Sequence, residues 1–268
     1  MSREYSNNSI KQTDIIQSLE RGLAVIQAFS PEYPTLTVSE AAKITELSRP
    51  TVRRILLTLE HLGYVTSKNG HFSLTARVLS LGYAYLSSKN IWESAHDYMK
   101  DLVNQTNEST SISVLDDTDI VYVARIPTKR IMTISLDVGS RLPAYATSMG
   151  QVLLAHLSPP ELEAYFQKIE LKAFTKKTII DKSELINRFK EIRDNGWVFV
   201  EQQLEEGLSS IAAPIRNAEG KVIAAINISA QAGRTNEKTR KEAFIPLLLQ
   251  TAIQISKEIS KSHHVSHL

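Results

Sequence analysis

Apolar residues in the first part of the chain recur at helical spacing. A first helix is predicted by a stripe of residues three or four positions apart: Leu19, Leu23, Ile26 and Phe29. Ser18 precedes this stripe and belongs to the residue types that cap helix N-termini, whereas Pro31 and Pro34 end the helical pattern. We therefore expect the folded part of the chain to begin with one amphipathic helix.

The next pattern predicts two further helices separated by a tight turn. Thr37 and Glu40 have the spacing of a capping box at the start of a short helix, and the turn covers residues 45–47. Ser48 is placed to cap the third helix, with Pro50 in its first turn. The buried face of the third helix is expected to consist of Val52, Ile55, Leu56 and Leu59. The opposite face carries Pro50, Arg53, Arg54, Leu57 and His61.

A strand pattern follows the third helix directly. Residues 64–68 and 71–74 are joined by Asn69 and Gly70, and an Asn-Gly pair between two such segments is a strong signal for a two-residue hairpin turn. Three helices followed by a hairpin have the element order of a winged helix-turn-helix, in which the recognition helix enters the major groove of DNA.

The distribution of charge favours the same interpretation. The formal net charge is only +2 at pH 7, but residues 43–77 contain six basic residues against two acidic ones. Positive charge on the third helix and the hairpin is typical of contacts with phosphates and base edges. The candidate DNA contacts are Arg49, Thr51, Arg53, Arg54, Thr58, Lys68 and His71. The alternative is a three-helix packing domain with a solvated basic face and a surface hairpin.

Helix and strand patterns alternate in the rest of the chain. Residues 75–88 have helical character with apolar residues on more than one face, so we expect a linker helix that also packs against a second surface. Strands are predicted at residues 111–115, 120–125, 131–136, 197–200, 210–216 and 222–229. Helices are predicted at 151–156, at 183–195 before Gly196, and at 238–261, the last bent or interrupted by Pro246. Antiparallel strands with helices against them indicate an α+β fold.

Composition narrows the classes of function. The 268 residues are enough for two domains, the 42% of hydrophobic and 22% of charged residues are ordinary for a soluble protein, and cysteine is absent. We find neither a signal peptide nor an apolar run long enough to span a bilayer, and we expect a cytoplasmic protein. No common catalytic motif occurs, so we expect no enzyme and no cofactor. We attribute His263, His264 and His267 to a polar tail rather than to a metal site.

Long segments resemble the IclR family of bacterial transcription regulators: SLERGLAVIQAFS, LTVSEAAKITELSRPTVRRILLTLEHLGYV and GLSSIAAPIRNAEGKVIAAINIS. Others look like the branch of this family that controls aromatic-acid catabolism through the β-ketoadipate pathway: VLSLGYAYLSS, DIVYVARIPTKRIMTISLDVG and RLPAYATSMGQVLLAHL. The resemblance implies a winged helix-turn-helix DNA-binding domain at residues 1–75, a linker helix at 76–90 and a GAF-like effector-binding domain at 91–268.

The resemblance also implies partners. We expect a homodimer, or a tetramer built from dimers, on a double-stranded DNA operator. The effector would be protocatechuate, 4-hydroxybenzoate or β-ketoadipate, and the regulator would activate rather than repress its genes. The alternatives are an IclR-type repressor of another carbon-catabolic operon that responds to a small organic acid, and a purely architectural DNA-binding protein.

The effector site is expected where residues 143–150 lead into the helix at 151–156. Thr147 or Ser148 would begin this helix, whose free N–H groups and dipole favour the carboxylate of an aromatic acid, with Tyr145 and Met149 beside the ring. With the positions that the resemblance adds, the candidates are Thr147, Ser148, Met149, Glu201, Ser210, Asn227 and Ser229. Because Asn227 and Ser229 are two residues apart, their side chains share one face of a strand.

Several points about this site stay open. Glu201 and Ser209 are secondary candidates, and Arg125 and Arg141 are each either a partner for the carboxylate or a surface residue. The family often carries acidic residues where this chain has Gln202 and Gln203, which leaves open the polar side of the pocket and therefore the effector. The alternative for the whole set is a helix cap together with hydroxyls at a sheet edge.

Overall fold

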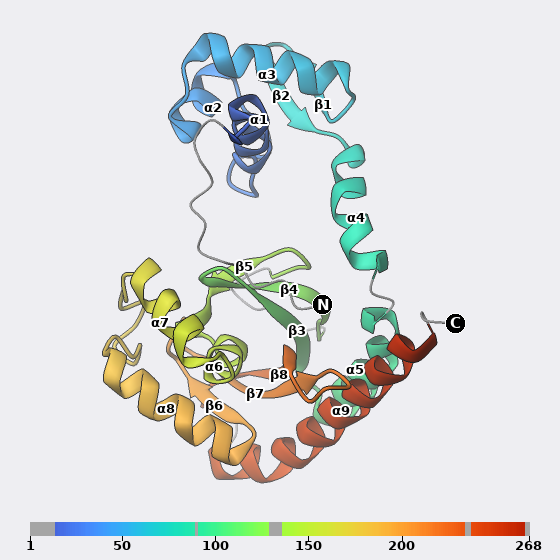
Figure 1. Ribbon diagram of the computed structural model, residues 1–268, viewed down its shortest axis with the longest axis vertical. Coiled ribbons are helices and arrows are strands. Elements are labelled where there is room, and N and C mark those ends of the chain that lie inside the picture. Colours follow the sequence, from blue (N-terminus) through green and yellow to red (C-terminus); the bar gives the residue numbers. More distant parts are fainter. Residues whose placement is uncertain (1–13, 89–90, 129–135, 234–236, 266–268) are drawn as a thin grey trace. The chain divides into compact units, whose positions relative to one another are not determined.

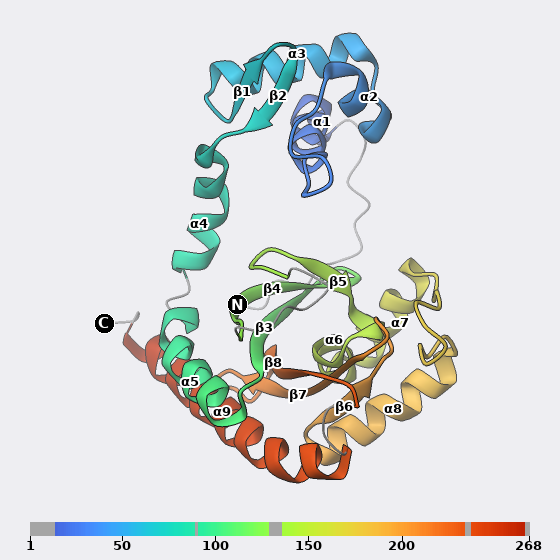
Figure 2. The same ribbon diagram turned by 180° about the vertical axis from the view of Figure 1, so that it is seen from behind.

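The computed structural model describes residues 14–88, 91–128, 136–233 and 237–265. The chain forms two compact units, residues 1–88 and 89–268 (Figures 1 and 2). Short helices and a two-stranded hairpin make up the first unit, and the second is built on one large sheet. The helix that the sequence predicts at residues 75–88 belongs to the first unit.

The first unit contains three helices, a hairpin and a terminal helix. In chain order the elements are α1 (Gln17–Gln27), α2 (Val38–Thr45), α3 (Arg49–His61), β1 (Val65–Lys68), β2 (His71–Leu74), the 3-10 turn η2 (Ala76–Val78) and α4 (Leu79–Ser88). Val25, Leu36, Val52 and Leu56 are fully buried at the centre of a small core. The predicted winged helix-turn-helix is confirmed.

Local signals in the sequence start and stop these elements. Thr37 Oγ1 accepts from the N–H of Glu40 at 3.3 Å while the Glu40 carboxylate accepts from the N–H of Thr37 at 2.7 Å, which confirms the capping box. The Ser48 hydroxyl caps α3. Asn69 and Gly70 both have positive φ values, as a two-residue hairpin turn requires.

The prediction for α1 was wrong in two respects. The helix begins at Gln17 with Ile16 in the N-cap position, so Ser18 lies inside the helix and does not cap it. The side chains of Leu19 and Leu23 are 60% and 47% exposed, whereas Val25 is fully buried. Ile26 and Phe29 of the predicted stripe are partly buried against the core, together with the buried Val25 and Ala28, so the face of α1 that meets the core is rotated away from Leu19 and Leu23.

The second unit is built on a six-stranded antiparallel sheet in the described part of the chain. Its strand order is β5-β4-β3-β8-β7-β6. The strands are β3 (Ser109–Asp116), β4 (Asp119–Ile126), β5 (Arg141–Pro143), β6 (Val198–Glu201), β7 (Leu208–Arg216) and β8 (Val222–Gln231). A two-residue turn joins β3 to β4, and β8 lies between β3 and β7 and so links the two halves of the sheet.

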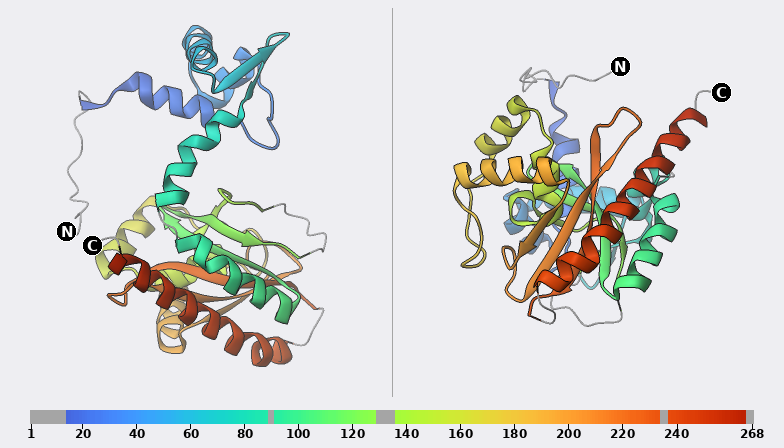
Figure 3. Two further views of the ribbon diagram at one scale, coloured as in Figure 1. Left: turned by 90° about the vertical axis from the view of Figure 1, so that its right-hand side faces the viewer. Right: turned by 90° about the horizontal axis from the view of Figure 1, so that it is seen from below.

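Helices cover both faces of this sheet. On one face, α5 (Ile91–Thr106) and α9 (Glu237–Val265) lie side by side (Figure 3) and bury Met99, Leu102 and Leu248 against it. On the other, α6 (Ser148–Ala155), α7 (Pro159–Lys168) and α8 (Lys182–Asn195) enclose a second core around Met149 and Phe189. The predicted α+β fold is confirmed.

Most predicted elements of this unit are present with shifted ends. The helix expected at residues 151–156 begins three residues earlier, at Ser148, and α9 continues through Pro246. Of the strand expected at 131–136, residues 131–135 lie outside the described residues and Leu136 is not in a strand. The helices α5 and α7 and the short strand β5 were not predicted.

The helix α6 is held against the 3-10 turn η3 (Ala144–Ala146) by a glycine. A Cβ atom built on Gly150 would lie 2.0 Å from the backbone oxygen of Ala144, a distance that no real contact allows. The side chains on either side of Gly150 are also buried, so the turn has no room to move away. Glycine therefore fixes the position of α6 on the sheet.

We expect Gly150→Ala to lower the free energy of unfolding by about 1–3 kcal/mol, because the new methyl group would meet backbone atoms of Ala144 that are buried and cannot move away. Urea denaturation followed by circular dichroism measures this. Gly22→Ala, on α1 where no atom lies within 4 Å of the place that a Cβ would take, is the control and should not destabilise the protein. A Gly150→Ala variant with the wild-type midpoint would contradict the close approach.

Candidate functional site

The first unit exposes a set of unpaired cations. Arg49, Arg53 and Arg54 on α3 and Lys68 at the tip of the hairpin are exposed, and none of them has an ion pair or a side-chain hydrogen bond within the described part of the chain. His71 is exposed beside Lys68, and its ring nitrogen Nδ1 lies 3.3 Å from the backbone oxygen of Asn69. The predicted contacts thus include four cations free to meet phosphate or base edges.

The two threonines predicted on α3 are already hydrogen-bonded. Thr51 is half-buried and its hydroxyl lies 2.8 Å from that of Ser48, as part of the helix cap. Thr58 is exposed and donates to the backbone oxygen of Arg54 at 2.8 Å. Together with Arg54, both threonines line a groove between α3 and the exposed leucines of α1. Arg49 and Arg53 are not among the residues that line this groove, so the cations of α3 occupy two flanks of the helix.

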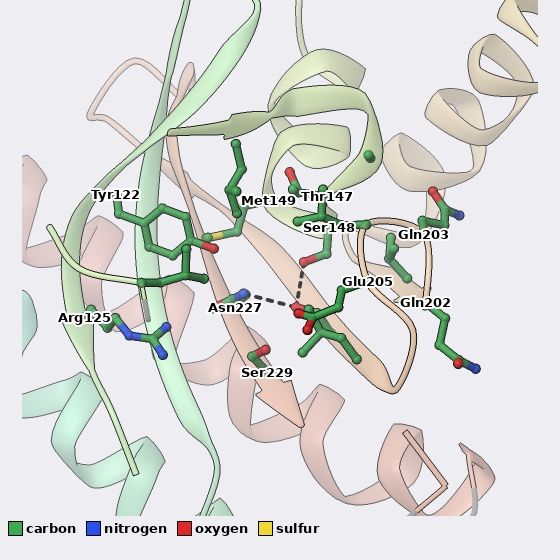
Figure 4. A pocket seen from close by; sticks show the side chains of 17 residues that line it. Tyr122, Arg125, Thr147, Ser148, Met149, Gln202, Gln203, Glu205, Asn227 and Ser229 are labelled. Carbon is green, nitrogen blue, oxygen red and sulfur yellow. Dashed lines mark hydrogen bonds between the residues drawn. The ribbon is translucent and has the colours of Figure 1, made fainter. Parts of the chain in front are cut away.

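The second unit contains a cavity that is partly open to solvent (Figure 4). It lies between the start of α6, strands β4, β7 and β8, and the loop that follows β6. Its apolar walls are formed by Leu136, Leu142, Ala146, Met149, Val200, Leu204 and Leu208. Its polar lining consists of Tyr122, Arg125, Thr147, Ser148, Gln202, Gln203, Glu205, Ser210, Asn227 and Ser229.

A chain of hydrogen bonds crosses one side of this cavity from β4 to α6. Arg125 Nη1 donates to the hydroxyl of Ser111 on β3 at 3.1 Å, and the N–H of Ser111 donates to Asn227 Oδ1 on β8 at 3.1 Å. Asn227 Nδ2 donates to Ser210 Oγ on β7 at 3.1 Å, and Ser210 Oγ lies 2.7 Å from Ser148 Oγ (Figure 4). We call these five residues the polar chain.

The polar chain leaves a hydrogen-bond donor for the cavity. Ser210 and Ser148 have two hydroxyl protons, and their mutual bond uses one of them. Whichever of the two serines donates in their mutual bond, the proton of the other has no acceptor among the described residues. The N–H groups of Ser148 and Met149 belong to the first turn of α6 and have no partner within the helix. This end of the cavity therefore offers donors to a polar group.

Comparison with known families decides what the two units are. Residues 18–68 match the model of the IclR helix-turn-helix domain, and residues 83–257 match that of the bacterial transcriptional regulator IclR C-terminal domain. This chain belongs to the IclR family. It is a transcriptional regulator and not an enzyme.

Several relatives of this IclR-family regulator are named as regulators of aromatic-acid catabolism. It is 42% identical to the Pca regulon regulatory protein of Pseudomonas putida, over 92% of this chain and 85% of that one. It is 35% identical to the p-hydroxybenzoate hydroxylase transcriptional activator of Acinetobacter baylyi, over 95% and 96% of the two chains. A solved inducer-binding domain of the PobR transcription factor from Acinetobacter, a double mutant in complex with 3-hydroxybenzoic acid, is 32% identical with a TM-score of 0.58, over 62% and 97%.

The structure brings six of the seven predicted effector residues of this regulator to one cavity. They are Thr147, Ser148, Met149, Ser210, Asn227 and Ser229. Thr147 has its hydroxyl engaged, because it accepts from the N–H of Gly150 at 3.1 Å and donates to the oxygen of Ala144 at 3.2 Å. Its role is to cap α6 and hold Ser148 at the cavity.

Other candidates lie outside the cavity lining. Glu201 pairs with Lys177 Nζ at 2.8 Å, and Ser209 donates to the backbone oxygen of Ala230, since strand alternation turns both away from the cavity. Tyr145 is buried against Lys172, to whose backbone oxygen its hydroxyl donates. Arg141 is a surface residue that pairs with Asp116 at 2.5 Å. Of the two arginines left open by the sequence, only Arg125 lines the cavity.

The two glutamines that depart from the family pattern have different environments. Gln202 lines the cavity, but its Oε1 accepts from the N–H of Gly207 and so stabilises the loop. Gln203 also lines the cavity, but it is mostly buried and its Oε1 accepts from Gln151 Nε2 in the first turn of α6 at 2.7 Å. Both side-chain oxygens are therefore engaged within the protein.

A β-bulge in β4 brings two residues to the cavity: Tyr122, which the sequence analysis missed, and Arg125, which it left open. Ile112 pairs with Ala124, but Ser113 pairs with Tyr122, so Val123 is an extra residue in β4. Tyr122 and Arg125 consequently both line the cavity although they are three residues apart. Burial raises the pKa of Tyr122 to about 12, against the opposing effect of Arg125, and its hydroxyl stays protonated at neutral pH.

Two further missed residues, Leu204 and Glu205, lie in the loop at 202–207. Glu205 and Leu204 face the cavity because positive φ values at Gln202 and Gly207 turn the loop back over the sheet. No periodic signal marks such a loop, and only the glycine at 207 hints at the turn.

In the described part of the chain, no three His, Cys, Asp or Glu side chains gather where they would hold a metal ion. His267 lies outside the described residues, whereas His263 and His264 fall within α9. The same described residues contain no helix with the length and apolar character needed to cross a membrane.

His156 occupies the C-cap position of α6, and both of its ring nitrogens make hydrogen bonds. His156 is half-buried, and its Nδ1 donates to the backbone oxygen of Val152 at 2.8 Å. Its Nε2 therefore accepts from Arg216 Nη2, 3.1 Å away. Burial lowers the pKa of His156, the bond to Val152 opposes this, and the charges of Arg216 and Arg193 lower it further. The folded protein thus favours the uncharged ring.

We expect this histidine to make the protein less stable in mild acid. The pKa of His156 is lower in the folded state than in the unfolded chain, where it is about 6.5. The contribution of His156 to the free energy of unfolding is therefore fully present above about pH 6.5 and is lost as the pH falls below that value toward and through the folded-state pKa. Urea midpoints at pH 8 and pH 5 should differ less for His156→Gln than for the wild type. His96→Gln, at an exposed position on α5, should keep the wild-type difference. An unchanged difference in His156→Gln would exclude this role.

Proposed function

We propose that this IclR-family regulator activates genes for aromatic-acid catabolism through the β-ketoadipate pathway when protocatechuate, 4-hydroxybenzoate or a related aromatic acid occupies the cavity. The observation that carries this proposal is the polar chain along a cavity that also has apolar walls. Apolar walls suit a benzene ring, and buried polar groups with spare donors favour a ligand with matching polar substituents. The names of the two relatives and the bound hydroxybenzoate of the PobR domain support the same class of effector.

The residues proposed to contact the effector are those that both the sequence and the cavity select. Ser148, Ser210, Asn227 and Ser229 supply polar contacts, and Met149 packs against the ring. Ser148 is central among them, because it begins α6 and is also the last residue of the polar chain. Movement at Ser148 would therefore be transmitted to α6 and to the sheet together.

The operator is proposed to be bound by α3 and the hairpin. Arg49, Arg53 and Arg54 lie in the first turns of α3, the part of a recognition helix that is nearest to base edges, and the planar fork of arginine bonds two acceptors on guanine. Lys68 and His71 at the hairpin tip are placed to contact phosphates. The engaged hydroxyls of Thr51 and Thr58 make these two residues secondary contacts.

We propose a homodimer, or a tetramer of such dimers, formed in part through α4. Leu79 and Tyr83 of this helix are 75% and 69% exposed, an unusual state for large apolar side chains of one helix. Burial against a second copy would remove these surfaces from water and would present two recognition helices to a repeated operator. Effector binding would then shift the population between arrangements of the DNA-binding units.

A gel-shift assay on the protein's own promoter region, paired with transcription from that promoter, tests the whole proposal. Protocatechuate or 4-hydroxybenzoate should change the mobility or affinity of the complex and raise transcription. Release from DNA with derepression would instead indicate a repressor. A complex that none of the aromatic acids alters, together with no thermal stabilisation by any of them, would favour an architectural protein.

We expect Arg54→Ala to weaken operator binding by roughly tenfold, since one charge-assisted contact is worth about 1–3 kcal/mol. The affinity of the Arg54→Ala variant for the effector, measured by calorimetry, should equal that of the wild type within error, because Arg54 belongs to the first unit and the cavity to the second. Lys190→Ala removes an equal charge at an exposed position on α8 and should affect neither property. If Arg54→Ala lost operator affinity and effector affinity to the same extent, the two units would not have separate roles in DNA binding and effector binding.

We expect Ser148→Leu to abolish the effector response and to leave operator affinity unchanged. The larger apolar side chain fills the cavity and removes the terminal hydroxyl of the polar chain. Ser183→Leu makes the same replacement at an exposed position near the start of α8 and should respond normally. Effector titrations of the gel shift compare the variants, and a normal response in Ser148→Leu would remove the cavity from the proposal.

A further inference from the structure

Two opposite charges face the cavity without an ion pair. Arg125 on β4 and Glu205 in the loop after β6 both line it, and neither has an oppositely charged partner within the described part of the chain. In Figure 4 their charged groups enter from opposite sides, with Asn227 and Ser229 between them. Among the described residues, Arg125 makes one side-chain hydrogen bond, to Ser111, which leaves most of its five N–H donors unused there.

The two ends of the cavity differ in the hydrogen bonds that they offer. The end at Arg125 has only donors on its guanidinium, and it suits a group that only accepts, such as a carboxylate. The end at Glu205 and Ser148 has an acceptor in the carboxylate and a donor in the spare hydroxyl proton. A phenol both donates and accepts, so it suits this second end. A carboxylate there would lie near the like charge of Glu205.

We propose that Arg125 binds the carboxylate of the effector and that Glu205 accepts a hydrogen bond from a ring hydroxyl opposite to it. This inference rests on the proposed effector cavity and deepens it by assigning the orientation and the specificity of the ligand. It reverses the orientation expected from the sequence, which placed the carboxylate at the start of α6. It also excludes β-ketoadipate as a good ligand, because its second carboxylate would face Glu205.

Calorimetric titrations of the full-length protein with four ligands test this assignment. The ligands are 4-hydroxybenzoate, its amide 4-hydroxybenzamide, benzoate and β-ketoadipate. The wild type should bind 4-hydroxybenzoate more tightly than each of the others, by about tenfold or more, since each comparison removes or opposes one charge-assisted hydrogen bond. Tighter binding of the dicarboxylate than of 4-hydroxybenzoate would overturn the proposal without any variant.

Two variants separate the two ends. Arg125→Gln should bind 4-hydroxybenzoate and its amide with similar affinity, having lost the preference for the charged acid. Glu205→Gln keeps an acceptor oxygen but loses the charge, so it should have a weaker preference for 4-hydroxybenzoate over benzoate, keep its affinity for benzoate and gain affinity for β-ketoadipate. Arg141→Gln and Glu206→Gln are the matched controls, because Arg141 is paired on the surface and Glu206 is exposed next to Glu205. Both should keep the wild-type preferences.

The outcomes distinguish an error in the effector class from an error in its orientation. If the wild type binds neither 4-hydroxybenzoate nor benzoate, the proposed effector class is wrong and this orientation is wrong with it. If the wild type binds them but Arg125→Gln keeps its preference for the acid over the amide, only the orientation is overturned. An equal loss of affinity for 4-hydroxybenzoate and benzoate in Glu205→Gln would also overturn it, since a structural defect would affect both ligands alike.

Discussion

Polar groups that line an apolar cavity are costly unless they bond to one another, and the second unit depends on how this requirement is met. Arg125, Ser111, Asn227, Ser210 and Ser148 form one continuous chain of hydrogen bonds. The chain passes through strands β4, β3, β8 and β7 and ends on the first residue of α6. The side chains that are available to a ligand are thus the same ones that connect the sheet to its covering helix.

Close packing keeps this arrangement in register. Gly150 lets α6 approach η3 to a distance that any side chain would forbid, and Thr147 caps the helix at that point. The bulge at Val123 turns Arg125 toward the same face as Tyr122. A change in the cavity at Ser148 is consequently felt by both the helix and the sheet, because neither has free volume in which to absorb it.

The surface of the first unit differs from the cavity of the second, because its charged and apolar side chains are not satisfied by one another. Its small core accommodates one face of α1 and of α3, and large apolar side chains of both helices stay exposed near arginines that have no ion pair within the described residues. Unpaired cations suit contact with a polyanion, and exposed leucines and tyrosines suit contact with another protein surface. The two features lie on one unit, so DNA binding and assembly are available to the same few helices.

The sequence by itself determined the elements whose signals are local. The capping box at Thr37, the cap at Ser48, the turn at Asn69 and the stop at Gly196 act within a few residues, and each fixes an element wherever it lies in the fold. The pattern at residues 143–150 indicated Thr147, Ser148 and Met149, and the family resemblance added Ser210, Asn227 and Ser229 to the cavity residues. Tertiary structure alone decided the rest: which stripe of α1 meets a core, which arginine reaches the cavity, and that Glu205 faces it. Those outcomes depend on packing, on a strand bulge and on an irregular loop, none of which leaves a periodic pattern in the chain.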